Sequence, residues 1–185
     1  MTGLMLGACR GDKEPLGPTA TVPQGTTTTN PYAVPPVIDE AYVNRVLAGL
    51  DQAVGDVVRL VVSTRTIPPE AVDRLRSLYV GEHRQFQLDL LSADVGRGLT
   101  NYREPPGNRR TTVMEVVAAT STCIFSKVSR DYSAVALETT GDFSIQWVVL
   151  IPAETGRSAY NPTSWTFLYD GFEPDGSAPE NLCAK

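Results

Sequence analysis

The sequence predicts an α+β domain in which two N-terminal helices pack on a bent antiparallel sheet, preceded by a disordered tether. Three observations predict this order. Apolar residues recur at helical spacing between positions 39 and 91, strand-forming residues dominate from position 111 onward, and the segment before position 37 is rich in Pro and Thr. Helices that precede a run of strands, rather than alternate with them, are typical of α+β domains.

Length and composition limit the class of protein. The chain has 185 residues, of which 42% are hydrophobic, so it can form one domain with a core. Its net charge of −5 argues against a nucleic-acid partner. A single histidine and the absence of Walker, nucleophile-elbow, zinc-protease and dinucleotide motifs lead us to expect no cofactor and no bound metal.

The first nine residues resemble the end of a bacterial lipoprotein signal. Leu6-Gly7-Ala8-Cys9 matches the lipobox, a Leu-small-small-Cys pattern whose cysteine is acylated and becomes the first residue of the mature protein. The charged region and the long apolar region of a full signal are absent before it. We therefore interpret residues 1–9 as a remnant signal with Cys9 as the lipid anchor; the alternative is an unmodified Cys9 in a cytosolic tail.

Residues 10–36 are predicted to be a disordered linker. They contain six prolines, a run of four threonines and almost no large apolar side chains, so they cannot bury enough surface to offset their ordering entropy. Proline favours extended conformations, which makes such a segment a semi-stiff spacer. A lipid anchor, a spacer and a domain at residues 37–185 form the usual plan of an envelope lipoprotein. We expect an extracytoplasmic protein attached to the cell membrane through Cys9.

The first helix is predicted over residues 39–64, with Asp39 as its N-cap. Its apolar stripe consists of Val43, Val46, Leu47, Leu50, Val54, Val57, Val58 and Val61, and the charged residues assigned off this stripe are Arg45, Asp51, Asp56 and Arg59. Pro68 and Pro69 end that helix and begin a second one, because proline is tolerated only in a first turn. The second helix is predicted to run to about Leu91, followed by a loop over residues 92–110.

The strands are predicted after this loop. Residues 111–128 are rich in Thr and Val, but no single face stays apolar, which indicates a bulge or bend partway. Residues 132–138 are a second predicted strand. Apolar residues alternate with Ser144 and Gln146 and predict a half-buried strand: Phe143, Ile145, Trp147, Val149 and Ile151. In a last strand, Trp165, Phe167 and Tyr169 alternate with Ser164, Thr166 and Leu168.

Cys123 and Cys183 are predicted to form a disulfide. Two such cysteines in an exported protein are expected to be oxidised. The bond would close a loop of about 60 residues, for which the chain-entropy model gives roughly 4 kcal/mol of stabilisation. Two isolated thiols are the alternative, and the chain has no C-x-x-C motif for zinc or redox chemistry.

Long helices followed by a strongly bent antiparallel sheet are similar to the NTF2-like, cystatin-type cone of bacterial lipoproteins and actinomycete envelope-associated proteins. The resemblance covers about residues 37–172 and concerns the order of elements. It includes no signature motif and therefore implies no catalytic residue. A clear strand between the helices is missing, which leaves a simpler sandwich of two helices on a sheet open.

His83 is the candidate for a catalytic base, since it is the only histidine. It lies on or beside the apolar face of the second predicted helix, four residues after Tyr79 and three before Phe86. Catalysis would require a carboxylate to orient the ring and a pocket for substrate. We favour the alternative, a partly buried structural histidine.

Three other sets of residues have both a functional and a structural interpretation. Four arginines lie in the predicted loop: Arg97, Arg103, Arg109 and Arg110. They are either a docking patch for an acidic partner or lipid headgroups, or part of a solvated loop. A ligand cavity, or else ordinary core, is expected around Phe143, Trp147, Tyr160, Trp165, Phe167 and Tyr169. Calcium could be bound by Asp170, Glu173 and Asp175, which flank glycines, but we favour the alternative that these residues form an ordinary turn.

Our functional expectation is a non-catalytic scaffold or assembly factor that contacts an envelope protein through its sheet or its arginine loop. The first alternative is a binding module whose cone carries a small apolar ligand or lipid. The second is an enzyme similar to SnoaL-like proteins, using His83 and a pocket carboxylate. A closed cavity would favour the binding module, and a filled core with an exposed apolar patch would favour the scaffold.

Overall fold

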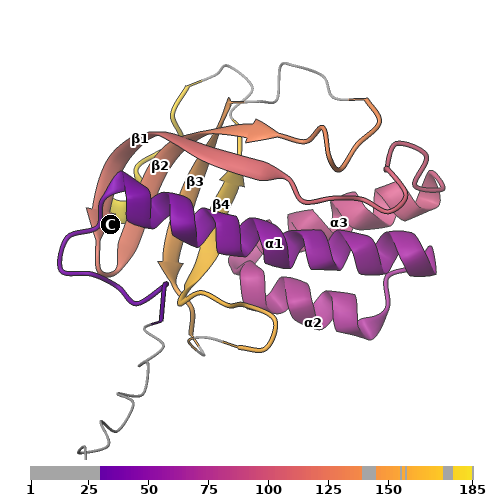
Figure 1. Ribbon diagram of the computed structural model, residues 1–185, viewed down its shortest axis with the longest axis horizontal. Helices are drawn as coiled ribbons and strands as arrows, with labels where there is room; N and C mark the ends of the chain where they lie inside the picture. Colours follow the sequence, from indigo (N-terminus) through magenta and orange to yellow (C-terminus); the bar gives the residue numbers. More distant parts are fainter. Residues whose placement is uncertain (1–29, 139–144, 155, 157, 173–176, 185) are drawn as a thin grey trace, which may run out of the picture.

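The computed structural model describes residues 30–138, 145–154, 156, 158–172 and 177–184. Within them the chain forms helices α1 (Glu40–Thr64), α2 (Pro69–Leu78) and α3 (Gly81–Gly96), strands β1 (Arg110–Thr120), β2 (Cys123–Asp131), β3 (Ile145–Pro152) and β4 (Trp165–Gly171), and the short 3₁₀ helix η2 (Leu182–Ala184). The strands make one antiparallel sheet in the order β1-β2-β3-β4. The predicted α+β class is confirmed. In Figure 1, α1 crosses the sheet, and α2 and α3 lie beside it.

Helix α1 follows the predicted boundaries. The Asp39 side chain accepts a hydrogen bond of 2.7 Å from the Tyr42 backbone N–H, which caps the first turn. The helix ends at Arg65, whose φ of 54° is left-handed. One stripe of apolar residues on α1 is fully buried against the sheet. Asp51 was predicted to lie off this stripe, but it is only 3% exposed, so that assignment was wrong.

The second predicted helix is two helices, α2 and α3. Tyr79 leaves the helical region with φ −131° and ψ 147°, and Gly81 has a φ of +58°, which favours glycine. Between them the chain pairs with the edge of β4, where the Val80 N–H donates to the Phe167 carbonyl at 3.1 Å. Covering a sheet edge offsets the lost helical hydrogen bonds. A helical spacing of apolar residues cannot reveal such a non-local contact.

The predicted strand over residues 111–128 is a hairpin of β1 and most of β2. Its turn is held by the Thr120 hydroxyl, which accepts from the Thr122 and Cys123 N–H groups at 3.3 and 3.0 Å. The expected irregularity is also present, since the β1–β2 register shifts between Val113 and Glu115 and again between Val116 and Ala118. The strand predicted over residues 132–138 is wrong. That segment is a turn and loop with one isolated bridge, from Ala136 to Tyr102.

Helix α1 also protects the free edge of β1. The Asn44 side chain accepts a hydrogen bond of 2.9 Å from the Val113 N–H, and the Asp51 carboxylate accepts one of 2.8 Å from the Thr111 N–H. These bonds satisfy backbone donors that an edge strand would otherwise present to another chain. They also fix the position of α1 along the sheet.

The opposite face of the sheet carries a second apolar cluster, covered by the C-terminal segment. Cys123, Phe125, Trp147 and Val149 are buried there, and Leu182 packs against them. The predicted disulfide is confirmed: Cys123 and Cys183 are bonded, with a Cα–Cα distance of 5.5 Å. The bond fixes η2 to the sheet.

The end of the predicted linker already contacts the domain. The Tyr42 hydroxyl donates to the Tyr32 carbonyl at 3.1 Å, and Gly49 provides the space for the Tyr32 ring. A Cβ at position 49 would lie 2.8 Å from the Tyr32 hydroxyl oxygen. Cys9 and residues 10–29 lie outside the described residues. In the part of the chain described, no helix is long and apolar enough to cross a membrane.

Candidate binding cavity between the helices and the sheet

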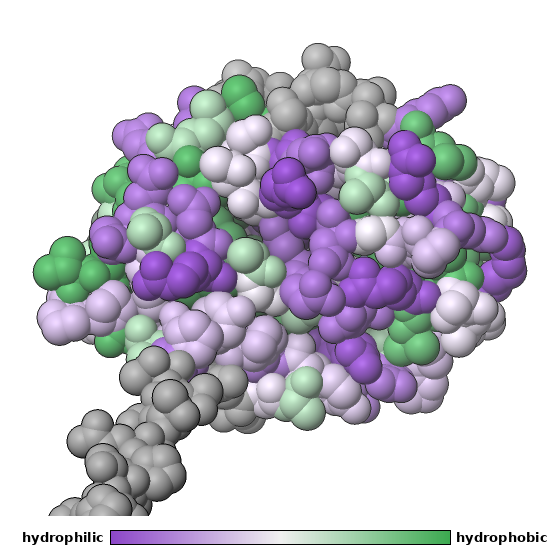
Figure 2. All heavy atoms as spheres, in the orientation of Figure 1, coloured by the Kyte–Doolittle hydropathy of each residue, from purple (hydrophilic) through white to green (hydrophobic). Residues whose placement is uncertain are grey.

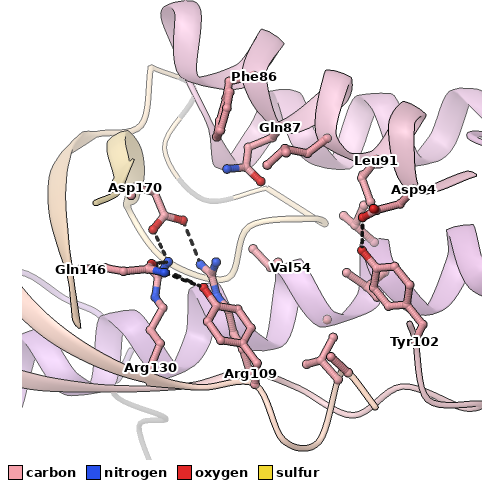
Figure 3. Close-up of a pocket in the computed structure, with 18 of the residues that line it drawn as sticks. Val54, Phe86, Gln87, Leu91, Asp94, Tyr102, Arg109, Arg130, Gln146 and Asp170 are labelled. Atoms are coloured by element: carbon pink, nitrogen blue, oxygen red, sulfur yellow. Dashed lines mark hydrogen bonds and ion pairs between the residues drawn. The ribbon is translucent and has the colours of Figure 1, made fainter. Parts of the chain in front are cut away.

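A cavity of about 590 Å³ lies between the helices and the sheet. Its walls are mainly apolar and include Val54 and Val58 of α1 and Leu91 of α3 (Figure 3). Phe86 and Leu90 also line it and are 51% and 43% exposed, so they mark its mouth. The volume lies within the range of roughly 300–1,000 Å³ that is typical of small-molecule sites.

Four polar side chains form the base of this cavity, which we call the polar floor: Arg109, Arg130, Gln146 and Asp170 (Figure 3). Arg109 directly precedes β1, and the others come from β2, β3 and β4. Each is 8% exposed or less. Strand alternation explains the position of Arg130, since it shares a face with Val128, which is in the helix-side core. Gln146 shares a face with Val148 in the same way.

A bulge in β4 places Asp170 in the polar floor. Phe167 pairs with Leu150 and Tyr169 pairs with Val149, so Leu168 is an extra residue in β4. Phe167 belongs to the helix-side core, and in a regular strand a residue three positions later would face the opposite side. The bulge restores Asp170 to the helix side, where it meets both arginines.

The two arginines of the polar floor form ion pairs with two carboxylates, Asp170 in the floor and Asp51 beneath it. Arg109 Nε lies 2.7 Å from Asp51 Oδ1, and Arg109 Nη2 lies 3.2 Å from Asp170 Oδ2. Arg130 Nη1 forms an ion pair with Asp170 Oδ1. All four groups are nine-tenths buried or more. Their formal charges cancel, which is the condition under which buried charges are tolerated.

Arg130 has one part of its guanidinium without a partner. Its Nε donates to the Thr111 hydroxyl at 3.2 Å and its Nη1 to Gln146 Oε1 at 2.6 Å. Its Nη2 is buried and has no hydrogen-bond partner among the described residues. A buried donor without an acceptor is costly, so an acceptor that reached this atom would stabilise the site.

The pKa of Asp170 shows how strongly the arginines act on it. Burial alone would raise the pKa, but the charges of Arg130 and Arg109 outweigh burial and lower the pKa to about 2. Tyr79 donates to Asp170 Oδ2 at 3.3 Å, and burial raises the pKa of its hydroxyl well above the usual value. At neutral pH the carboxylate is therefore charged and Tyr79 is neutral.

His83 does not line the cavity. Its ring lies against the rings of Tyr79, Phe86 and Tyr169, with centroid distances of 5.6 to 5.7 Å. Its side-chain neighbour in hydrogen-bond range is Gln87, at 3.4 Å. Burial lowers the pKa of the ring, although the nearby Asp170 acts in the opposite direction. These contacts agree with a structural histidine.

The four loop arginines are not brought together into one surface. Arg109 is buried in the polar floor. Arg97 forms an ion pair with Asp94, and Arg103 Nε donates to the Ser133 carbonyl at 2.6 Å. Arg110 is exposed at the start of β1.

The described aromatic residues that were expected to line a cavity do not line this one. Trp165 and Phe167 fill the helix-side core, while Trp147 belongs to the cluster on the opposite face. Phe143, Glu173 and Asp175 lie outside the described residues. Within the described ranges, no three His, Cys, Asp or Glu side chains gather as a metal site would require.

Sequence reasoning named Arg109 and Asp170, but it assigned them to a loop patch and a turn. Both assignments were wrong, because the two side chains are buried and pair with each other in the polar floor. One signal was available, because Asp51 follows Leu47 by four residues and precedes Val54 by three, which places it on the apolar stripe. A charged residue at such a position indicates a buried partner. Arg130 and Gln146 gave no comparable signal, since their pairing depends on strand register.

Comparison with protein-family models, with curated proteins and with solved structures finds no match. The site is therefore interpreted from its own geometry.

Proposed function

We propose that the protein is a binding module that holds a small, mainly apolar molecule in the cavity between its helices and its sheet. The observation that carries this proposal is the combination of apolar walls with the polar floor, in which Arg130 Nη2 lacks a partner. Ligand sites are typically apolar cavities with a few convergent polar groups. His83 is not among the residues that line the cavity, which favours binding over the enzyme alternative.

We further propose that the protein acts outside the cytoplasm, attached through a lipid on Cys9. The Cys123–Cys183 disulfide supports this location, because such bonds persist in oxidising compartments. An NTF2-like cone remains our proposal for the fold family. It is supported by the α+β class and by a cavity between helices and sheet, whereas the division into α2 and α3 departs from the expected two helices.

A scaffold role is the second candidate, and exposed apolar residues favour it. Met114, Val117 and Ile145 are 51%, 42% and 46% exposed. On the face seen in Figure 2, hydrophobic side chains are scattered among hydrophilic ones. On that face, a partner protein would use single apolar contacts rather than one broad patch.

The binding proposal is tested with N-phenyl-1-naphthylamine, a neutral apolar dye whose fluorescence increases in an apolar site. We expect saturable binding to the wild type and at least about ten-fold weaker binding to Val54→Phe, since a ring at position 54 fills the cavity. The matched control is Ala48→Phe, which adds the same ring to an exposed position of α1. Equal binding by all three proteins would contradict the proposal.

A further inference from the structure

The polar floor offers more hydrogen-bond donors than acceptors. A guanidinium carries five N–H groups and no acceptor. Asp51 already accepts from Arg109 and from both the backbone and the hydroxyl of Thr111. Asp170 already accepts from Tyr79 and Arg109 and pairs with Arg130. An acceptor oxygen on the ligand would complete the donors of Arg130.

The charge balance argues that this oxygen is uncharged. The two arginines are the cations that line the cavity in the described chain, and Asp51 and Asp170 already neutralise them. The other charged lining residues are Asp94 and Glu138, which are acidic. A ligand carboxylate would therefore enter a buried site as a third, unbalanced negative charge, and such burial is strongly unfavourable.

The side chains of the cavity walls indicate that the rest of the ligand is apolar. Val54, Val58 and Leu91 lie above the polar floor, and Phe86 and Leu90 form the mouth. An apolar chain fits against these side chains, while a polar body would lose its hydration without gaining hydrogen bonds.

We infer that the cavity selects neutral acyl compounds, esters or amides of an aliphatic acid, whose carbonyl oxygen accepts a hydrogen bond from the Arg130 guanidinium. This inference rests on the proposed binding function and adds the chemistry of the ligand's polar end.

The test measures displacement of N-phenyl-1-naphthylamine from the folded protein at pH 7.5 by three compounds with the same carbon chain. They are methyl octanoate, 1-methoxyoctane, in which CH₂ replaces the carbonyl, and octanoate. We expect methyl octanoate to compete about ten-fold more strongly than the ether, because the ether lacks the carbonyl oxygen and keeps only the weaker acceptor of its ether oxygen. We expect octanoate to be weaker than the ester.

Arg130→Lys is the matched variant, since it keeps the charge beside Asp170 but removes the planar N–H groups. It should still bind the dye, and its preference for ester over ether should fall to less than about three-fold. Should this variant fail to fold, the wild-type ratios still decide the question. Equal competition by ester and ether, or strongest competition by octanoate, would overturn the inference while leaving the binding function in place. No dye binding to the wild type would overturn both.

Discussion

The space between the helices and the sheet has two halves that are built from the same elements and packed differently. In the closed half, Trp165, Tyr42 and Leu47 are essentially unexposed, and Trp165 Nε1 donates to the Tyr42 hydroxyl at 2.8 Å. In the open half, the cavity separates Val54 and Val58 from the polar floor. Helix α1 begins over the closed half and ends over the open one. The large residues Tyr42, Leu47 and Leu50 of α1 fill the closed half together with Val43 and Val46, whereas α1 lines the cavity with three valines and Gly55.

Stability and binding therefore occupy different ends of one interface. In the closed half, the Trp165 indole N–H is satisfied internally by the Tyr42 hydroxyl. The open half has a buried ion network with an unpaired donor, which is unfavourable unless something completes it. The following substitutions test that division.

The largest effect is expected from Asp170→Asn in the polar floor. This nearly isosteric change leaves two buried guanidinium groups with one carboxylate, so the free energy of unfolding should fall by about 3–5 kcal/mol in urea denaturation. The control is Glu138→Gln at an exposed lining position, which should change it by less than about 0.5 kcal/mol.

Acid titration sharpens this prediction. The pKa of Asp170 is lowered to about 2 in the folded protein, below its unfolded value, so its contribution is present above about pH 4 and is lost as pH falls toward 2. In the Asp170→Asn variant, the free energy of unfolding should depend less on pH between about pH 4 and pH 2. A loss below about 1 kcal/mol at neutral pH would show that the network contributes little.

A matched pair of leucines compares the halves directly. Leu47→Ala in the closed half should cost about 2–5 kcal/mol, because a cavity forms in close-packed core. Leu90→Ala at the mouth should cost less than about 1 kcal/mol, since Leu90 is 43% exposed. Both changes in the free energy of unfolding are measured by thermal or urea unfolding. Equal losses for the two variants would contradict the difference in packing between the two halves.

The smallest effect is expected at His83, beside the open half. Burial lowers the pKa of His83 in the folded protein, although Asp170 opposes this shift while Arg130 and Arg109 reinforce it. The unfolded chain therefore takes up a proton first, and stability should decline as pH falls below about 6.5. His83→Phe should reduce this decline in unfolding curves measured between pH 8 and 5. An unchanged slope would show that His83 does not cause it.

The sequence predicted much of the closed half and little of the open one. Periodicity located α1, because burial on one side of a helix leaves a regular pattern. Alternation located the strand that became β3, but the expected half-buried strand was wrong, since β3 is buried on both faces. The break at Tyr79 and Gly81 depends on a distant edge of β4 and has no local pattern. Asp170 reaches the polar floor through a bulge, and Arg130 meets it across strands. Register of this kind is determined by tertiary packing, not by the spacing of apolar residues.

The most direct test of the central claim is native mass spectrometry of the unreduced protein taken from the membranes of its own producing cells. We expect part of the wild-type protein to carry a bound molecule, seen as extra mass that is released on denaturation. Val54→Phe should lack this extra mass, and Ala48→Phe should keep it. The released mass should belong to a neutral compound with an acyl carbonyl. Wild-type protein with no releasable mass, or an equal releasable mass on Val54→Phe, would contradict the claim that the open half is a ligand site.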